Sequence, residues 1–266
     1  MTDGDGSVSL SFELAKRGRG VYVWPSSVSR AAPLRLTVGG RRLERFMDSI
    51  YVAGRLEKLR ADQIRSINQI RRPLMNLDTV GWTNSRIRQA IAAGAAAAGA
   101  KDILEWGCGY SPMVEFLPTV SRYACTDIDH SVIEWQLSCG YDEAILTDDL
   151  LREGNLGKFD AILSAFVFHF RIPRSHIVKM RTLLRSSGFI LANVYRRDST
   201  SRKQLCLEFE RAGLNVCRRA DESGSCARQE FWYIGHPSPD FAARADLTLA
   251  ALFRRLAFSQ SADVDG

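Results

Sequence analysis

The sequence predicts an α/β protein with a seven-stranded, mostly parallel sheet that has one antiparallel edge strand, helices on both faces, and an N-terminal β/α extension. Three observations predict this fold. Between residues 82 and 236, short apolar runs with strand character alternate with segments of helical periodicity. One of these strands ends at Glu105 and runs directly into a turn that contains Gly107 and Gly109. The last two strands are joined by a loop, residues 218–228, and a loop without a helix permits antiparallel pairing.

The composition is that of a globular protein, with 45% hydrophobic and 25% charged residues among 266. Because no run of about 18 apolar residues occurs, we expect no membrane-spanning helix. The polar and acidic start, residues 1–6, does not resemble a signal peptide. The six cysteines form no Cys-x-x-Cys pair and have no histidine at zinc spacing. We therefore expect reduced thiols, no metal site and a cytoplasmic location.

The positive charge is concentrated early in the chain. Residues 1–73 contain 14 Lys and Arg against 7 Asp and Glu, a balance of 14 − 7 = +7, whereas the whole chain carries +6. A basic segment can attract nucleic acid or an anionic substrate. The alternative is a solvated helical face without a binding role.

Residues 1–81 are predicted to form a separate extension. Short strands are expected in its first half, at residues 7–14, 21–24 and 34–38. From residue 41 to 75, apolar side chains recur every three to four positions, which predicts two helices that Pro73 ends. This layer is either packing or a lid over a ligand site. Residues 76–81 are expected to be a linker.

The first element of the core is predicted to be a helix that Thr83 or Asn84 caps and that runs to Ala98. Its second half, residues 90–100, is almost entirely alanine and glycine. Alanine is the best helix former, and its small side chain lets a helix lie close on a sheet. Gly99 is a suitable residue to end the helix.

The seven strands of the core, residues 82–236, are expected at 101–105, 122–126, 143–146, 159–165, 189–194, 214–217 and 229–234. Helices are expected between them, including 113–117, 177–184 and 201–212. Because helices separate the first five strands, these should be parallel. Residues 237–266 complete the chain with a helix over 240–258 and a loose tail over 259–266.

The strand, turn and helix start at residues 101–112 predict a nucleotide-binding crevice at the carboxyl end of a parallel sheet. Ser111 can cap a helix, and Pro112 suits the first helical position. Pro112 also occupies the position where the dinucleotide-binding fingerprint needs its third glycine, so that fingerprint is absent. The phosphate-binding Gly-Lys-Ser/Thr sequence is absent too. What remains is Glu-x-Gly-x-Gly, whose carboxylate would repel a pyrophosphate and attract a cationic ligand group.

Residues 105–109 resemble the first motif of the class I methyltransferases that use S-adenosylmethionine, a ligand with an ammonium and a sulfonium. Further matches to this family occur in register along the chain, at Asp127, Asp148, 159–160 and 183–188. The resemblance covers about residues 83–236. It implies the methyltransferase fold, with S-adenosylmethionine as the cofactor.

The resemblance also implies where the cofactor binds. At the glycine turn it is expected to contact Glu105, Gly107, Cys108 and Gly109. Residues 127–131 resemble the family's second motif, with Asp127, followed by Ile128, in the place that binds the ribose diol. Two carboxylate oxygens match two neighbouring hydroxyls. Asp129 is the alternative diol ligand, and otherwise it caps the next helix together with Ser131.

Two further acidic positions follow from the resemblance. An acid after the third strand hydrogen-bonds the adenine amino group in this family, and Asp148 matches that place better than Asp149. Helix capping by either acid is an equally good interpretation. Phe159-Asp160 matches the start of the family's fourth strand, where Asp160 is structural.

Methyl transfer from a sulfonium is an in-line displacement, and alignment of donor and acceptor can supply about 7–11 kcal/mol. A general base helps only when the acceptor is a hydroxyl or an ammonium near neutral pH. His169, just beyond the fourth strand, is the candidate base, with a buried or capping histidine as the alternative. Tyr195, at the end of the fifth strand, is expected to line the acceptor pocket. His176 is expected on a helix surface.

The sequence therefore favours methyl transfer to a small-molecule acceptor. Two alternatives stay open: an RNA-directed methyltransferase that uses the basic N-terminal segment, and a non-catalytic partner protein with the same fold. Residues 164–167 are Ser-Ala-Phe-Val, whereas amino-methylating DNA enzymes have Asn/Asp-Pro-Pro-Tyr after the fourth strand. The Pro-Cys nucleophile of cytosine C5 methyltransferases is absent as well. Both classes of DNA methyltransferase are therefore not expected. The acceptor, the methylated atom and the oligomeric state do not follow from the sequence.

Overall fold

The computed structural model describes residues 15–17, 21–23, 35–38, 41–46, 49–52, 56–71, 77–152, 156–221 and 229–261. The chain divides into two compact units, residues 1–85 and 86–266. The strand expected at residues 7–14 and the last five residues of the expected tail lie outside the described residues.

The first unit contains two small antiparallel sheets. One pairs β1 (Ala15–Arg17) with β2 (Val21–Val23), and the other joins β3 (Arg35–Val38), β4 (Arg41–Phe46) and β5 (Ser49–Val52). The strands expected at 21–24 and 34–38 are confirmed. The helix expected from residue 41 is wrong over 41–46 and 49–52, because β4 pairs with strands on both sides. A 3₁₀ turn, η1 (Leu56–Lys58), and a helix, α1 (Ala61–Arg71), follow as predicted.

The helix α2 (Leu77–Ala97) begins seven residues before Asn84, so the predicted linker at 76–81 is wrong over 77–81. Thr83 and Asn84 lie inside this helix and do not begin it. One interior glycine, Gly81, weakens a helix by only about 1 kcal/mol relative to alanine, which a long helix tolerates. Gly99, with φ 71°, ends the helical path as expected.

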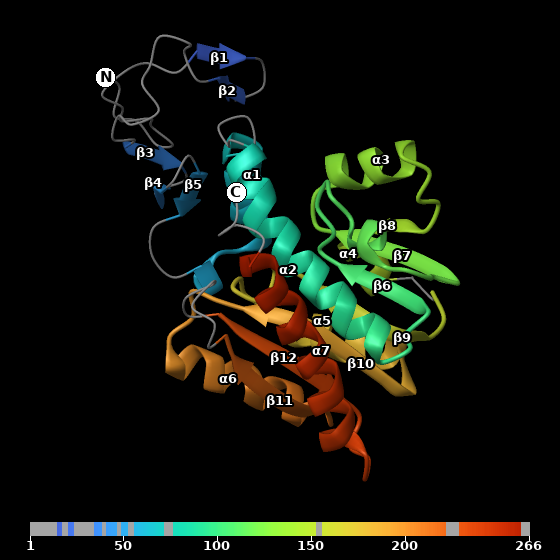
Figure 1. The fold of residues 1–266 in the computed structure, drawn as a ribbon. Coiled ribbons are helices and arrows are strands. Elements are labelled where there is room, and N and C mark those ends of the chain that lie inside the picture. The colour runs from blue at the N-terminus through green and yellow to red at the C-terminus, as the bar shows by residue number, and fades with distance from the viewer. Residues whose placement is uncertain are drawn as a thin grey trace. The chain divides into compact units, whose positions relative to one another are not determined.

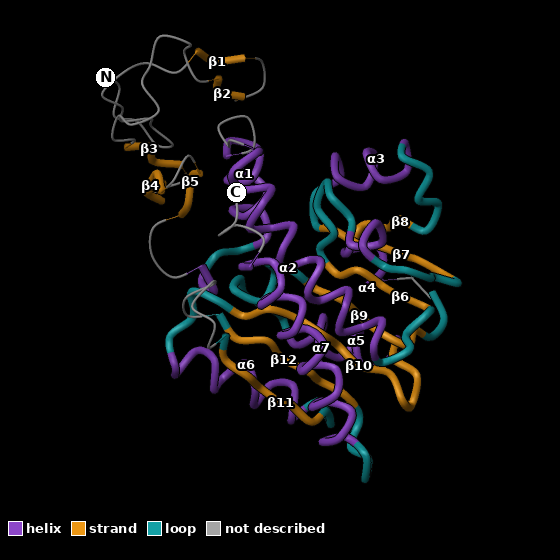
Figure 2. The backbone as a smooth tube through the Cα atoms, in the orientation of Figure 1, coloured by secondary structure: helices purple, strands orange, loops and turns teal. Residues whose placement is uncertain are grey.

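The second unit is built around one seven-stranded sheet with the order β11-β12-β10-β9-β6-β7-β8. The strands are β6 (Asp102–Trp106), β7 (Arg122–Asp127), β8 (Ala144–Leu146), β9 (Phe159–Ser164), β10 (Leu184–Val194), β11 (Asn215–Ala220) and β12 (Glu230–Gly235). The first five pair in parallel, whereas β12 is antiparallel to both of its neighbours. Figure 2 shows the strands in orange and the helices in purple. The predicted fold class is confirmed, and β11 and β12 form the antiparallel pair at the edge.

The helices of this unit are α3 (His130–Ser138), α4 (Thr147–Arg152), α5 (Arg174–Leu183), α6 (Ser199–Arg211) and α7 (Phe241–Ser261). The helix expected at 113–117 is only a single 3₁₀ turn, η3 (Met113–Phe116). Its N-cap is Pro112, without a side-chain cap, so the expected capping by Ser111 is wrong. Pro118 disfavours helical angles at Leu117, which is extended, and the turn ends there.

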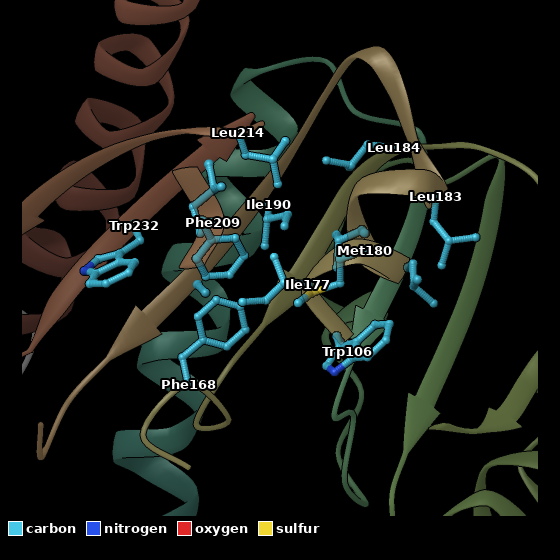
Figure 3. Close-up of a cluster of buried hydrophobic side chains, with 14 of the residues drawn as sticks. Trp106, Phe168, Ile177, Met180, Leu183, Leu184, Ile190, Phe209, Leu214 and Trp232 are labelled. Carbon is cyan, nitrogen blue, oxygen red and sulfur yellow. The ribbon is translucent and has the colours of Figure 1, made fainter. Parts of the chain in front are cut away.

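Helices cover both faces of the sheet, as predicted. On one face, α2 and α7 pack against β6, β9, β10 and β12, and they lie in front of the sheet in Figure 1. On the other face, α5 and α6 bury a second cluster that includes Trp106, Phe168, Met180, Phe209 and Trp232 (Figure 3). The two apolar layers hold the strand ends in fixed positions.

Gly94 of α2 packs closely against β10 and α7. A Cβ at this position would lie 2.9 Å from Leu191 Cδ2 and 3.1 Å from the Thr248 carbonyl oxygen on α7. Gly94→Val is expected to lower the free energy of unfolding by about 1–3 kcal/mol through overpacking. Urea denaturation measures it, with Ala97→Val, on an exposed residue of the same helix, as the control. Equal stability of the two variants would contradict the close contact.

Candidate functional site

Three acidic residues lie at one edge of the sheet. In the parallel register, Trp106 pairs with Thr126 and Asp127 pairs with Leu146. Because these strands end together, Glu105, Asp127 and Asp148 follow one another along the carboxyl edge of β6, β7 and β8. This edge lies beside the point where the strand order reverses, between β6 and β9, which is where open α/β sheets bind ligands.

The glycine turn after β6 is tied to the end of β7. The amides of Gly107 and Cys108 donate to the Thr126 carbonyl oxygen at 2.7 and 3.1 Å, and the Gly109 amide donates to Asp127 Oδ2 at 3.0 Å. Both glycines have positive φ, 78° at Gly107 and 60° at Gly109. These bonds hold the turn against Asp127, so the residues predicted at 105–109 and 127 do come together.

Glu105 is fully buried. Its carboxylate accepts from Arg88 Nη1 at 2.7 Å, from the Met113 amide at 2.6 Å and from Tyr123 Oη at 2.7 Å. Burial raises the pKa of Glu105, and these three donors act against that rise. The sequence predicted a carboxylate that attracts a cationic ligand group, but in the structure its charge is met inside the protein by Arg88.

Arg88 is a site residue that the sequence reasoning missed. It lies on α2, and its Nη2 also donates to the Cys108 carbonyl oxygen at 3.2 Å. The neighbouring residues Ile87, Ala90 and Ile91 are fully buried. An arginine among the apolar residues Ile87, Ala90 and Ile91 was a signal that it needed an internal partner.

Asp127 accepts one backbone amide on each carboxylate oxygen: the Gly109 amide on Oδ2, and the Asp129 amide on Oδ1 at 3.0 Å. Burial raises the pKa of Asp127, and the backbone amides act to lower it. The Ile128 amide also acts on this carboxylate. The two oxygens of a carboxylate offer about four lone-pair sites in all. Asp129 is engaged elsewhere, since its Oδ1 caps α3 by accepting from the Ser131 amide at 3.1 Å, as predicted. Ile128, between them, is partly buried.

Cys108 contributes its backbone to the turn, whereas its side chain is fully buried beside Cys125 and Val132. The contact with Cys125 and burial raise the pKa of the Cys108 thiol well above its usual value. A raised pKa favours the protonated form of the thiol. On the other side of the turn, the buried Gln136 of α3 donates from Nε2 to the Gly109 carbonyl oxygen at 2.6 Å, another contact that the sequence did not reveal.

Asp148 and Asp149, at the start of α4, have different surroundings. Asp149 forms an ion pair with Arg152 in the same helix. Asp148 is exposed, and its charge acts on His176. The expectation of a surface histidine at 176 is wrong, because its ring is half-buried 5.6 Å from that of Trp106. Burial lowers the pKa of His176, and Asp148 opposes that shift.

The structure brings the two residues predicted for the acceptor side together. His169 is buried, and its Nε2 lies 3.4 Å from Tyr195 Oη. The His169 ring centroid lies 4.3 Å from that of Tyr195 and 4.0 Å from that of Phe170. Arg197, which the sequence did not single out, ties the two loops by donating from Nε to the Phe168 carbonyl oxygen at 2.6 Å.

Asp160 has the structural role that was predicted. Its Oδ2 accepts from the amides of Lys101 and Asp102 at 3.0 and 2.9 Å, at the opposite end of β6 from the glycine turn. Arg185 bridges the carboxylates of Asp102 and Asp160.

Within the described ranges, no group of three or more His, Cys, Asp and Glu side chains could hold a metal ion. No helix that the structure describes is long and apolar enough to cross a membrane.

No protein-family model and no curated protein matches the sequence. Among solved structures, similarity is found to an S-adenosylmethionine-dependent methyltransferase from Clostridium acetobutylicum, with 10% identity, a TM-score of 0.47, and coverage of 58% of this chain and 92% of that one. The N-methyltransferase NodS from Bradyrhizobium japonicum has 18% identity and a TM-score of 0.46, over 61% of this chain and 100% of that one. The CcbJ methyltransferase from Streptomyces caelestis has 13% identity and a TM-score of 0.44, over 57% and 95%.

The fold assignment follows from the strand order of this chain. Its sheet has β6 and β9 at the centre, β7 and β8 to one side, and β10 with the antiparallel pair β12 and β11 to the other. This is the sheet, with an antiparallel pair at one edge, that the resemblance of residues 83–236 to the class I S-adenosylmethionine-dependent methyltransferases implied.

Proposed function

We propose that the second unit binds S-adenosylmethionine along the carboxyl edge of β6, β7 and β8, and transfers its methyl group to a small-molecule acceptor beside His169 and Tyr195. The observation that carries this proposal is the position of Asp127. Its carboxylate holds the Gly109 amide directly, so one side chain joins the glycine turn to the place where a ribose diol would bind. The cofactor and the enzymatic activity are both part of this proposal.

The charge of the turn suits the amino-acid end of the cofactor. Glu105 and Arg88 together carry no net charge, and they lie next to the Cys108 carbonyl. A zwitterion with one ammonium and one carboxylate fits such a neutral pair better than a pyrophosphate does. In this proposal Glu105 shapes the turn and orients Arg88, while it does not itself reach the ligand.

The other end of the cofactor is assigned to Asp127 and Asp148. The two carboxylate oxygens of Asp127 are assigned to the two ribose hydroxyls. Asp148, which is exposed at the start of α4, is assigned to the adenine amino group. The hydroxyls of Thr126 and Thr147, 2.8 Å apart, fix the ends of β7 and β8 relative to each other.

His169 is proposed as the general base for a hydroxyl or ammonium acceptor, and Tyr195 as a wall of the acceptor site. Their mutual contact fixes the orientation of the imidazole. When bound, S-adenosylmethionine would supply the methyl group by in-line displacement and leave as S-adenosylhomocysteine, and the imidazole would take the proton that the acceptor loses. A base of this kind contributes about 10²–10⁴-fold to the rate.

Calorimetry with S-adenosylhomocysteine tests the cofactor site. We expect binding at tens of micromolar or tighter, and a loss of about tenfold or more in Asp127→Asn, because a hydrogen bond to a charged group contributes about 1.5–3 kcal/mol. Asp129→Ser is the matched control, since serine retains the cap of α3. Absence of binding to the wild-type chain, or equal effects of the two variants, would argue against the proposal.

The RNA-directed and non-catalytic alternatives remain predictions from the sequence. Salt-dependent RNA binding that disappears when residues 1–75 are deleted would favour the first. Cofactor binding without turnover across a panel of acceptors would favour the second. The cytoplasmic location is also part of the proposal, and the five cysteines that the structure describes are free thiols, in keeping with it.

A further inference from the structure

Two residues other than glycine have positive φ in the described part of the chain, Phe166 at 60° and Arg196 at 54°. Both lie just beyond the carboxyl ends of adjacent strands, β9 and β10. Positive φ is uncommon for a bulky residue, and it persists only when its surroundings impose it. Phe166 therefore needs a group that holds its backbone.

Asn193 is that group. It is fully buried on β10, and its Oδ1 accepts from the Phe166 amide at 2.7 Å. Its Nδ2 donates to Gln229 Oε1 at 2.9 Å. The amide orientation is settled by the backbone N–H, which can only donate and therefore must face the oxygen. The oxygen and the nitrogen of the Asn193 side chain are therefore both hydrogen-bonded, and the oxygen holds the left-handed turn at Phe166.

The residues around Phe166 contact both the glycine turn and the pair of His169 and Tyr195. The next residue, Val167, lies so close to the glycine turn that a Cβ on Gly107 would be 2.3 Å from its Cγ2. Three residues after Phe166, the ring of His169 contacts Tyr195, which itself lies two residues after Asn193. The Phe166 ring also meets that of Tyr195 edge-on, with centroids 5.7 Å apart.

We propose that Asn193 is a positioning residue, which fixes the left-handed turn at Phe166 and so holds Val167 on the glycine turn and His169 beside Tyr195 at the same time. The buried Asn193 amide thereby sets the distance between the glycine turn, where the methyl donor is proposed to bind, and His169, where the methyl acceptor is proposed to bind. Its meaning for methyl transfer rests on the proposed function, whereas its effect on the two loops does not. Asn193 touches neither ligand in this proposal and acts through Phe166.

The positional part is tested by NMR on the full chain with ¹³C-labelled histidine, where the His169 signal is assigned by its absence in His169→Gln. In Asn193→Ala we expect the His169 signal to move by more than its linewidth. Leu256→Ala, at a buried position of α7, is the control for general loss of stability and should leave the signal in place. An unmoved His169 signal in folded Asn193→Ala would overturn the proposal.

Asn193→Asp is the conservative variant. It keeps the oxygen that accepts from Phe166, and the Gln229 amide can turn to donate to the second oxygen. We expect its His169 signal to stay at the wild-type position. If Asn193→Ala does not fold, Asn193→Asp provides the test instead. A shifted His169 signal in Asn193→Asp would then overturn the proposal.

The coupling to the donor side is tested by S-adenosylhomocysteine affinity in a double-mutant cycle with Phe166→Gly. Glycine adopts positive φ without strain, so the turn no longer depends on Asn193. We expect Asn193→Ala to weaken binding about tenfold when Phe166 is present and less than threefold beside Phe166→Gly. Equal losses in both backgrounds would overturn the coupling. Failure of the wild-type chain to bind S-adenosylhomocysteine refutes the proposed function, and the histidine signals still decide the role of Asn193.

Discussion

Arg88→Met is expected to lower the free energy of unfolding of the second unit by about 3–5 kcal/mol at neutral pH, the usual result of removing one partner of a buried ion pair. Methionine fills much of the space of the arginine stem, but it leaves the Glu105 carboxylate inside the protein with only the Met113 amide and Tyr123 as donors. Glu105 has no exposed surface, so water cannot replace the lost guanidinium.

The loss in Arg88→Met should depend on pH. Burial raises the pKa of Glu105 in the folded chain, and removal of Arg88, which opposes that rise, raises it further. The folded chain then holds a proton that the unfolded chain, with a pKa near ~4.3, has released. The stability that this bound proton contributes to Arg88→Met is fully present below the pKa of Glu105 in the unfolded chain. It is lost as the pH rises through the pKa of Glu105 in the folded chain. Urea denaturation from about pH 4 to pH 8 should therefore show a deficit that grows with pH.

Two further variants separate the ion pair from other effects of the arginine. Arg88→Met combined with Glu105→Gln carries no buried charge, so it should recover most of the lost stability and lose the pH dependence. Arg86→Met removes a bond to the Leu256 carbonyl oxygen and should give a smaller loss, independent of pH. A deficit in Arg88→Met that stays constant with pH would falsify the assignment of a charged pair.

Gly107→Ala is expected to disrupt the glycine turn, with a loss of about 2–5 kcal/mol in stability and at least tenfold in S-adenosylhomocysteine affinity. Two costs add at this position. A side chain at φ 78° is strained, and its Cβ would lie 2.3 Å from Val167 Cγ2, well inside van der Waals contact. Thermal unfolding and calorimetry measure the two effects.

Gly109→Ala is the matched control in the same turn. Its φ is 60°, but the nearest atom to a Cβ there is Arg88 Nη2 at 3.8 Å, so only the backbone strain of about 1–2 kcal/mol remains. Val167→Ala combined with Gly107→Ala removes the clashing methyl group and should recover part of the difference. If the two glycine variants were equally stable, contact between the turn and Val167 would not be what requires glycine at 107.

Local sequence patterns predicted the central sheet well and the first unit less well. The core strands have continuous apolar runs bounded by turns, as at Phe159–Ser164. Such runs predict a buried strand from the local sequence alone. Residues 41–52 also show helical spacing of apolar side chains, yet they form β4 and β5. Their conformation is decided by pairing, of β4 with β3 and of β5 with β4. Pairing between segments is not visible in the periodicity of one segment.

The acids at the strand ends were found from the sequence because parallel strands place their carboxyl ends at one edge, so Glu105, Asp127 and Asp148 had to be neighbours once the strands were known. Only the tertiary structure decided which side chains complete the site. Glu105 is paired with Arg88, 17 residues earlier on α2, and Phe166 is held by Asn193, 27 residues later on β10. Buried polar groups must find partners, and the packing of helices and strands that are distant in the chain determines which partners lie within reach.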